Sequence, residues 1–134
     1  MSDAPVSLAG RRSREAAMAH DKEAWLSVFA DDAIVQDPIG PSHFDPEGVG
    51  HRGTEAIARF YDMAIAPSEL TFNFERTYVC GDEEANVGSI VIRSSGYEVT
   101  AEGVFTYRVN DDGQMIALRA YWELDRATAS ARKI

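Results

Sequence analysis

The stretch Phe29-Ala-Asp-Asp-Ala-Ile-Val-Gln-Asp-Pro-Ile-Gly40 predicts the end of an amphipathic helix, an acidic turn and a short strand. The strand period of two places Ala33, Val35 and Asp37 on one face. Pro38 ends the strand, because it keeps the preceding residue extended and has no N–H to donate. A carboxylate at the end of an apolar face is desolvated, which raises its pKa and suits a general base. Asp-Pro is also a common opening of a turn, so this stretch alone leaves both roles open.

Composition restricts the class of protein. The chain has 134 residues, of which 45% are hydrophobic and 26% charged, as expected for one globular domain spanning residues 1–134. A net charge of −9 disfavours nucleic acid and anionic membrane surfaces as partners. The single cysteine, Cys80, excludes an internal disulfide and is typical of the cytoplasm. Neither a signal peptide nor an apolar run long enough to cross a bilayer is apparent, so we expect a cytoplasmic protein without membrane contact.

The hydrophobic periodicity changes along the chain from helical to strand-like. It predicts helices at residues 7–20, 22–29 and 54–66, followed by strands at 68–80, 86–94, 97–109 and 114–124. Asp21 is the expected N-cap of the second helix, and the tail 125–134 is expected to be ordered only in part. Three helices followed by long antiparallel strands indicate an α+β fold, and a sheet curved around helices leaves a concave cavity that favours ligands.

Two faces of these elements are relevant to such a cavity. One face of the first helix consists mostly of small residues, namely Ala9, Ser13, Ala16, Ala17 and His20. One face of the strand at 97–109 is mostly apolar and is expected to point inward; it consists of Tyr97, Val99, Ala101, Gly103, Phe105, Tyr107 and Val109. The loop at 38–53 contains His43 and His51, but their spacing in a flexible loop does not preorganise metal ligands. We expect no metal and no other cofactor.

Three segments resemble the bacterial ketosteroid isomerases, which belong to the superfamily named after nuclear transport factor 2. The similarity covers Phe29 to Gly40, Gly53 to Tyr61 and Gly113 to Trp122, in the order found in that family. The resemblance implies a cone in which a curved antiparallel sheet wraps three N-terminal helices and encloses a hydrophobic pocket. It also implies a homodimer through the outer face of the sheet, to which Thr100, Glu102, Val104 and Thr106 would contribute.

In such enzymes a base moves a proton beside a ketone, while hydrogen-bond donors stabilise the enolate oxygen. The resemblance places the base at Asp37. The position of the family's donor tyrosine corresponds to Ser13 in this chain. The position of the family's donor acid corresponds to Gly103, or to Phe105 after a register shift, so the resemblance implies that both donors are replaced. Tyr61 matches a tyrosine of the supporting network and is a candidate substitute donor together with Ser13.

The predicted catalytic residues are therefore Asp37, Tyr61 and Ser13. The predicted ligand contacts are Val35, Phe60, Gly103, Phe105, Leu118 and Trp122. The expected ligand is a steroid-like apolar small molecule. Alternatives are a binding protein without catalysis, and another enzyme on the same scaffold, such as a polyketide cyclase. An epoxide hydrolase would need an Asp-Arg-Asp relay that the inward-facing positions lack, and a module that only binds other proteins is the least favoured alternative.

Overall fold

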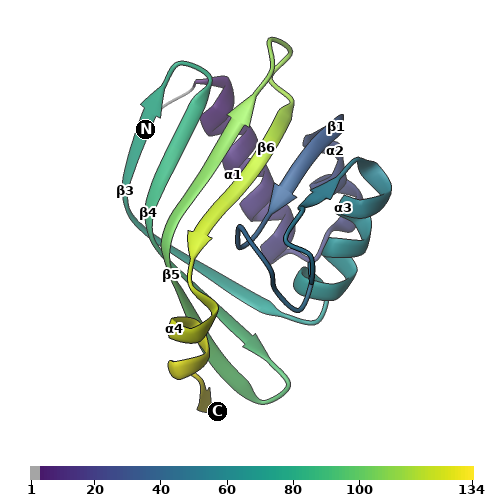
Figure 1. Cartoon of the computed structure of the whole chain (residues 1–134). Coiled ribbons are helices and arrows are strands. Elements are labelled where there is room, and N and C mark those ends of the chain that lie inside the picture. The colour runs from purple at the N-terminus through teal and green to yellow at the C-terminus, as the bar shows by residue number, and fades with distance from the viewer. Residues whose placement is uncertain (1–3) are drawn as a thin grey trace.

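The computed structural model describes residues 4–134, and in it a curved sheet wraps around the N-terminal helices (Figure 1). The elements are α1 Pro5–Met18, α2 Lys22–Ser27, β1 Phe29–Gln36, β2 His51–Arg52, α3 Thr54–Phe60, η1 Tyr61–Ile65, β3 Glu69–Cys80, β4 Glu83–Ser94, β5 Tyr97–Val109, β6 Met115–Trp122, α4 Leu124–Ala129 and β7 Arg132–Lys133. Six strands follow the order β2-β1-β6-β5-β4-β3, and β7 pairs with β5. The predicted α+β cone is confirmed, with one difference. Because β1 runs parallel to β6, the sheet is mostly rather than wholly antiparallel.

The first two helices form where the sequence predicts them, with shifted ends. The small residues of α1 face the core, and Ser13 and Ala17 are almost fully buried. Asp21 is the N-cap of α2, since its side chain accepts a hydrogen bond from the Ala24 N–H at 3.0 Å. The second helix ends at Ser27 rather than Phe29, because Phe29 already pairs with Met115 of β6. The key stretch therefore begins as a strand and not as a helix.

The third predicted helix begins as an α-helix and ends as a π-helix. After α3 the chain continues as the π-helical turn η1, in which the Ala66 N–H donates to the Tyr61 carbonyl oxygen at 2.9 Å. The preceding loop contains β2, which the sequence analysis missed. This strand pairs with Ile34 and Val35 of β1. A strand of two residues is too short to show a period in the sequence.

The long strands are joined as consecutive hairpins, and their curvature has local causes. Pairing shifts register between Phe74 and Arg76 in β3, and between Arg108 and Val109 in β5. The second shift places Met115 in the core, although the simple period of two predicts its neighbour Ile116 on the inner face. Gly88 and Gly103 lie opposite each other in β4 and β5. At both positions a Cβ would collide with a backbone carbonyl of the next strand.

The C-terminal tail is more ordered than the sequence analysis expects. Residues 124–129 form α4, and β7 then pairs with the start of β5. The carboxyl group of Glu98 holds this segment, since it accepts hydrogen bonds from Arg132 at 2.6 and 2.9 Å and from Arg93 at 2.8 Å. The expectation of partial order was wrong, because these partners are distant in sequence and follow no periodic pattern.

Most of the core lies between the helices and the concave face of the sheet. Trp25 of α2 is at its centre and contacts the rings of Phe29, Phe60 and Tyr61, at centroid distances of 4.7, 6.3 and 5.5 Å. A second, smaller cluster surrounds Phe105 on the sheet. Within residues 4–134, no helix has both the length and the apolar character needed to span a membrane.

Candidate functional site

An apolar cavity lies between the helices and the sheet, with about 870 Å³ of empty space, part of which is open to solvent. The large aromatic residues that line it are Trp25, Phe44, Phe60, Phe72, Phe105 and Trp122. Aliphatic side chains of the strands add Leu70, Ile90, Ile92, Ala101 and Leu118. The polar lining consists of Ser13, Arg14, Asp37, Ser68 and Tyr107.

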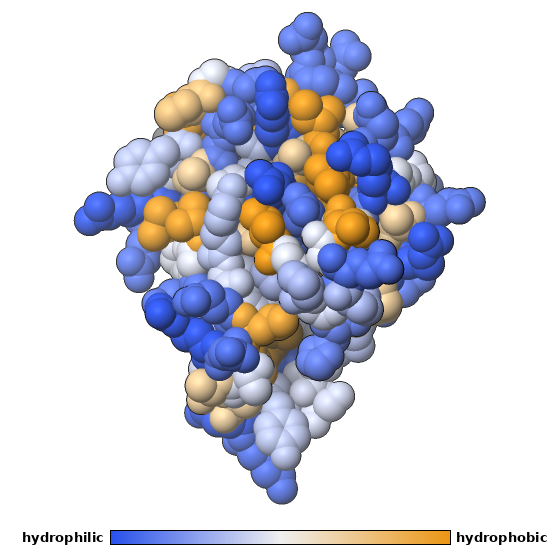
Figure 2. All heavy atoms as spheres, in the orientation of Figure 1, coloured by the Kyte–Doolittle hydropathy of each residue, from blue (hydrophilic) through white to orange (hydrophobic). Residues whose placement is uncertain are grey.

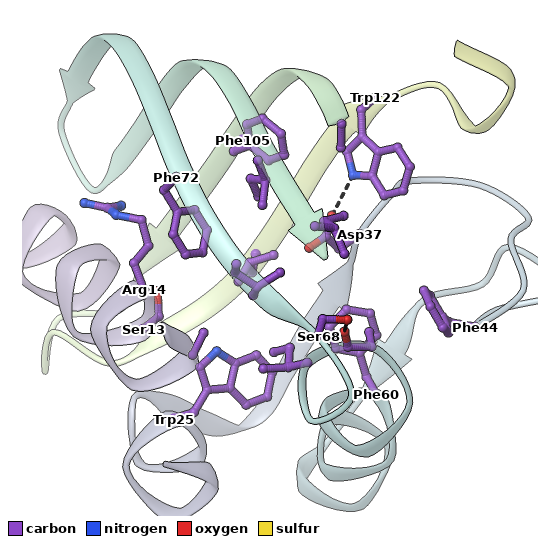
Figure 3. Close-up of a pocket in the computed structure, with 18 of the residues that line it drawn as sticks. Ser13, Arg14, Trp25, Asp37, Phe44, Phe60, Ser68, Phe72, Phe105 and Trp122 are labelled. Carbon is purple, nitrogen blue, oxygen red and sulfur yellow. Dashed lines mark hydrogen bonds between the residues drawn. The ribbon is translucent and has the colours of Figure 1, made fainter. Parts of the chain in front are cut away.

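Asp37 follows the last residue of β1 and lines this cavity (Figure 3). The strand alternation leaves Ala33 and Val35 in the core, so the next residue on the same face is carried to the cavity. One carboxylate oxygen accepts a hydrogen bond from the indole Nε1–H of Trp122 at 2.7 Å. Desolvation by the surrounding protein raises the pKa of Asp37, and the Trp122 hydrogen bond opposes this shift without cancelling it. The group has the environment that a general base needs.

Four of the six predicted ligand contacts line the cavity, namely Phe60, Phe105, Leu118 and Trp122. Phe60 comes from α3, and the other three come from β5 and β6. Phe105 is buried and stacks on Phe74 with centroids 5.4 Å apart. Phe105 and Trp122 lie on the sheet side of the cavity, and Phe60 faces them from the helical side (Figure 3).

Val35, Gly103 and Tyr61 are not among the lining residues. Val35 is fully buried in the core beneath the cavity. Gly103 opens no gap for a ligand, because the space beside its Cα is filled by the Tyr121 carbonyl and the Trp122 side chain. Of the two positions to which the resemblance assigns the usual donor acid, only Phe105 faces the cavity.

Tyr61 is buried in the main core cluster and does not line the cavity. Its ring packs on Trp25, and its pKa is raised by burial and by the negative charges of Asp21 and Asp62. Both of these aspartates are exposed to solvent. The structure therefore gives no support to Tyr61 as a donor beside Asp37.

Ser13, predicted as a catalytic donor, lines the cavity on the wall opposite Asp37 (Figure 3). Its hydroxyl donates to the Gly10 carbonyl oxygen at 2.7 Å. Two neighbours were missed as site residues, Arg14 and Tyr107, and the Arg14 Nη1 donates to the Tyr107 hydroxyl at 3.2 Å. Tyr107 was on the predicted inward face of its strand, which was a usable signal. Arg14 gave none, because a cation on an amphipathic helix is usually on the solvent side.

The sequence analysis considered the histidines of the 38–53 loop as metal ligands and disfavoured that role. In the described part of the chain, no three His, Cys, Asp or Glu side chains gather closely enough to hold a metal ion. His51 instead packs against Phe60, with ring centroids 5.0 Å apart.

The fold and the site define a class of protein, the α+β cone with an apolar cavity and a carboxylate in its wall. The profile of the SnoaL-like domain matches residues 11–118, so the chain belongs to the SnoaL-like family, which has the nuclear transport factor 2-like fold.

Solved structures agree with this assignment. Rv0760c from Mycobacterium tuberculosis is 38% identical over 94% of this chain and 96% of its own, with a TM-score of 0.89. The same protein has been solved in complex with estradiol-17β-hemisuccinate, with 39% identity over 91% of this chain and 96% of its own and a TM-score of 0.85. A Δ5-3-ketosteroid isomerase from Mycobacterium sp. is 37% identical over 97% of this chain and 98% of its own, with a TM-score of 0.84.

Proposed function

We propose that this protein binds a steroid-like, flat apolar ligand and moves a proton beside its ketone, with Asp37 as the general base. The observation that carries this proposal is the position of the Asp37 carboxyl group. It lies in the wall of an apolar cavity, its pKa is raised by desolvation, and it has a hydrogen bond from Trp122 at 2.7 Å. A base of this kind is matched to abstracting a weakly acidic proton from carbon.

The proposed reaction converts a β,γ-unsaturated ketone into its conjugated isomer. The Asp37 carboxylate takes a proton from the α carbon, and the electron pair of the broken C–H bond forms a dienolate with the negative charge on the ketone oxygen. The protonated Asp37 then returns the proton to the γ carbon, so the carbonyl re-forms and the double bond moves into conjugation. No oxidant or cofactor is consumed. The hydrogen bond from Trp122 orients the carboxylate through both transfers.

Similar proteins support this choice of ligand and reaction. The Δ5-3-ketosteroid isomerase and the estradiol-hemisuccinate complex of Rv0760c are both more than a third identical to this chain over nearly its whole length. A computationally designed 17-OHP binder is 38% identical over 91% of this chain. Structures described as a polyketide cyclase-like protein and an epoxide hydrolase are 15% identical, so they share the fold and say nothing of the chemistry.

The test is a rate assay with a β,γ-unsaturated 3-ketosteroid, in which the conjugated enone is followed by its ultraviolet absorbance. We expect turnover by the wild type and its loss in Asp37→Asn. Asp31→Asn is the matched control, because Asp31 lies on the same strand but is exposed to solvent. Steroid binding without turnover by the wild type would overturn the isomerase and leave a binding protein, the second candidate. The resemblance places Ser13 and Gly103, or Phe105 after a register shift, at the positions of the usual donors, and this replacement favours that candidate.

A further inference from the structure

Three polar groups meet on the wall opposite Asp37, and they come from two elements. Tyr107 of β5 extends toward α1, where its hydroxyl oxygen accepts a hydrogen bond from the Arg14 Nη1 at 3.2 Å. The Arg14 guanidinium lies over the rings of Phe74 and Tyr107, 5.2 and 5.8 Å from their centroids. The Ser13 hydroxyl, on the same helix as Arg14, donates to the Gly10 carbonyl oxygen at 2.7 Å. All three side chains line the cavity.

The small residues of α1 explain how Tyr107 reaches this position. A Cβ added at Gly10 would lie 2.8 Å from the Tyr107 ring, so only glycine leaves room for the ring at that turn of the helix. Ser13 lies one turn further along α1. The resemblance places the donor tyrosine of the ketosteroid isomerases at this position, where it would compete with Tyr107 for space. The absence of a side chain at Gly10 therefore leaves space on α1 for a tyrosine that enters from the sheet.

The Tyr107 hydroxyl remains a donor at neutral pH. Burial and the negative charge of Glu84 raise the pKa of Tyr107 and outweigh the opposite effect of Arg14. Arg14 donates to the hydroxyl oxygen, so this contact does not use the O–H hydrogen of Tyr107, which can be donated to a ligand. No carboxylate of residues 4–134 lies within 4.0 Å of the Arg14 side-chain nitrogens, so its positive charge is not neutralised by an ion pair there.

We propose that Tyr107, held by Arg14, donates a hydrogen bond to the ketone oxygen of the ligand while Asp37 acts on the adjacent carbon from the other wall. This inference rests on the proposed function and names the group that stabilises the enolate. The negative charge develops on an oxygen beside a phenol O–H and near a guanidinium, in a cavity that is otherwise apolar. Preorganised donors are most effective in such surroundings.

The test substitutes Tyr107→Phe, which keeps the ring and removes only the hydroxyl. Tyr121→Phe is the matched control, since Tyr121 is 51% exposed. With the β,γ-unsaturated 3-ketosteroid we expect Tyr107→Phe to lower kcat by about 100- to 1,000-fold, the usual loss for one oxyanion donor. Tyr121→Phe should stay at the wild-type value.

A second measurement separates this contact from a packing role. The dissociation constants of a 3-ketosteroid and of its 3-deoxy counterpart are compared on the wild type and on Tyr107→Phe. A hydrogen bond to the ketone makes the wild type prefer the oxygenated steroid, and Tyr107→Phe should lose that preference. A defect of packing would weaken both ligands alike and would overturn the proposal.

The outcomes distinguish the two proposals. If the wild type isomerises the steroid and Tyr107→Phe does so equally well, the donor proposal is wrong while Asp37 stands as the base. If the wild type shows no turnover, the isomerase proposal fails and the binding comparison decides alone. Loss of the oxygen preference in Tyr107→Phe then supports the contact, and an unchanged preference refutes it.

Discussion

The position of Asp37 at the end of β1 places its carboxyl group where the ionised form is poorly solvated. The strand alternation carries the carboxyl group into the cavity wall, where protein atoms replace part of its hydration. Its pKa is raised for that reason, and the one hydrogen bond from Trp122 compensates only in part. The folded protein therefore favours the protonated form of Asp37 more than the unfolded chain does. An ionised Asp37 therefore costs stability.

The consequence can be measured as a stability difference that depends on pH. Since folding raises the pKa of Asp37 above 3.8, the native state loses stability as pH rises through the folded pKa. Asp37→Asn removes the charge and keeps an oxygen that can accept the Trp122 hydrogen bond. We expect Asp37→Asn to have a higher free energy of unfolding than the wild type at pH 7, and an equal one well below pH 4. Each unit of raised pKa would contribute about 1.4 kcal/mol.

The measurement is urea unfolding of both proteins at several pH values. Asp31→Asn, at an exposed position of the same strand, should show no gain that grows with pH. An Asp37→Asn variant that is less stable than the wild type throughout the range would contradict this explanation. It would mean that the carboxylate has favourable partners that outweigh its desolvation.

At this scale the sequence was informative where one local pattern decided the position. A period of two and a proline predicted that Asp37 ends the apolar face of its strand. Its role as a base, and the ligand contacts Phe105, Leu118 and Trp122, were implied by the resemblance to ketosteroid isomerases, and all four residues line the cavity. Tyr61 could not be placed, because a motif match does not say which way a ring extends from a helix. Arg14 could not be predicted either, because its partner Tyr107 is 93 residues away in the sequence.

Among the elements, β5 both holds the sheet together and contributes residues to the cavity. It pairs with β4, β6 and β7, and it carries Phe105 and Tyr107 on its inner face. At Gly103 the strand passes so close to β6 that the Tyr121 carbonyl and the Trp122 Cβ occupy the place of a side chain. The alternation of β5 predicted its inner face correctly. The role of Gly103 depends on a close approach between strands that no periodic pattern reveals.

Gly103→Ala tests this close approach. The new methyl group would meet backbone atoms of β6, which cannot rotate away, and it would press on Trp122, whose indole bonds Asp37. We expect a loss of about 1–3 kcal/mol in the free energy of unfolding, as is typical of overpacking. Urea titration measures this loss. Glu102→Ala, at the neighbouring exposed position, should stay within about 0.5 kcal/mol of the wild type. Equal stabilities of the two variants would show that β6 can move aside.

At the scale of the whole molecule, the sheet separates two environments. Its concave face holds the cavity, and its outer face is turned toward the viewer in Figure 1, where β5 and β6 pass in front of α1. The same view in Figure 2 shows apolar side chains distributed among charged ones. Val104 and Tyr121 are directly paired neighbours on the outer face, and half of the Tyr121 surface is exposed. Such a mixed surface is typical of interfaces that also exist as free surfaces.

We propose that two copies of the chain associate through this outer face, with Val104 near the centre of the contact. The wild type should then have a mass of twice 14.7 kDa by light scattering after size exclusion. Val104→Glu places an unpaired charge in the contact and should give a monomer, because a charge without a partner is costly to bury. Val79→Glu is the matched control, since Val79 is 37% exposed near the hairpin between β3 and β4. It should remain dimeric. A monomeric wild type would refute the interface. If both variants remain dimeric, the interface lies on another face. Either result leaves the conclusions about the cavity unchanged, because its residues lie on the opposite side of the sheet.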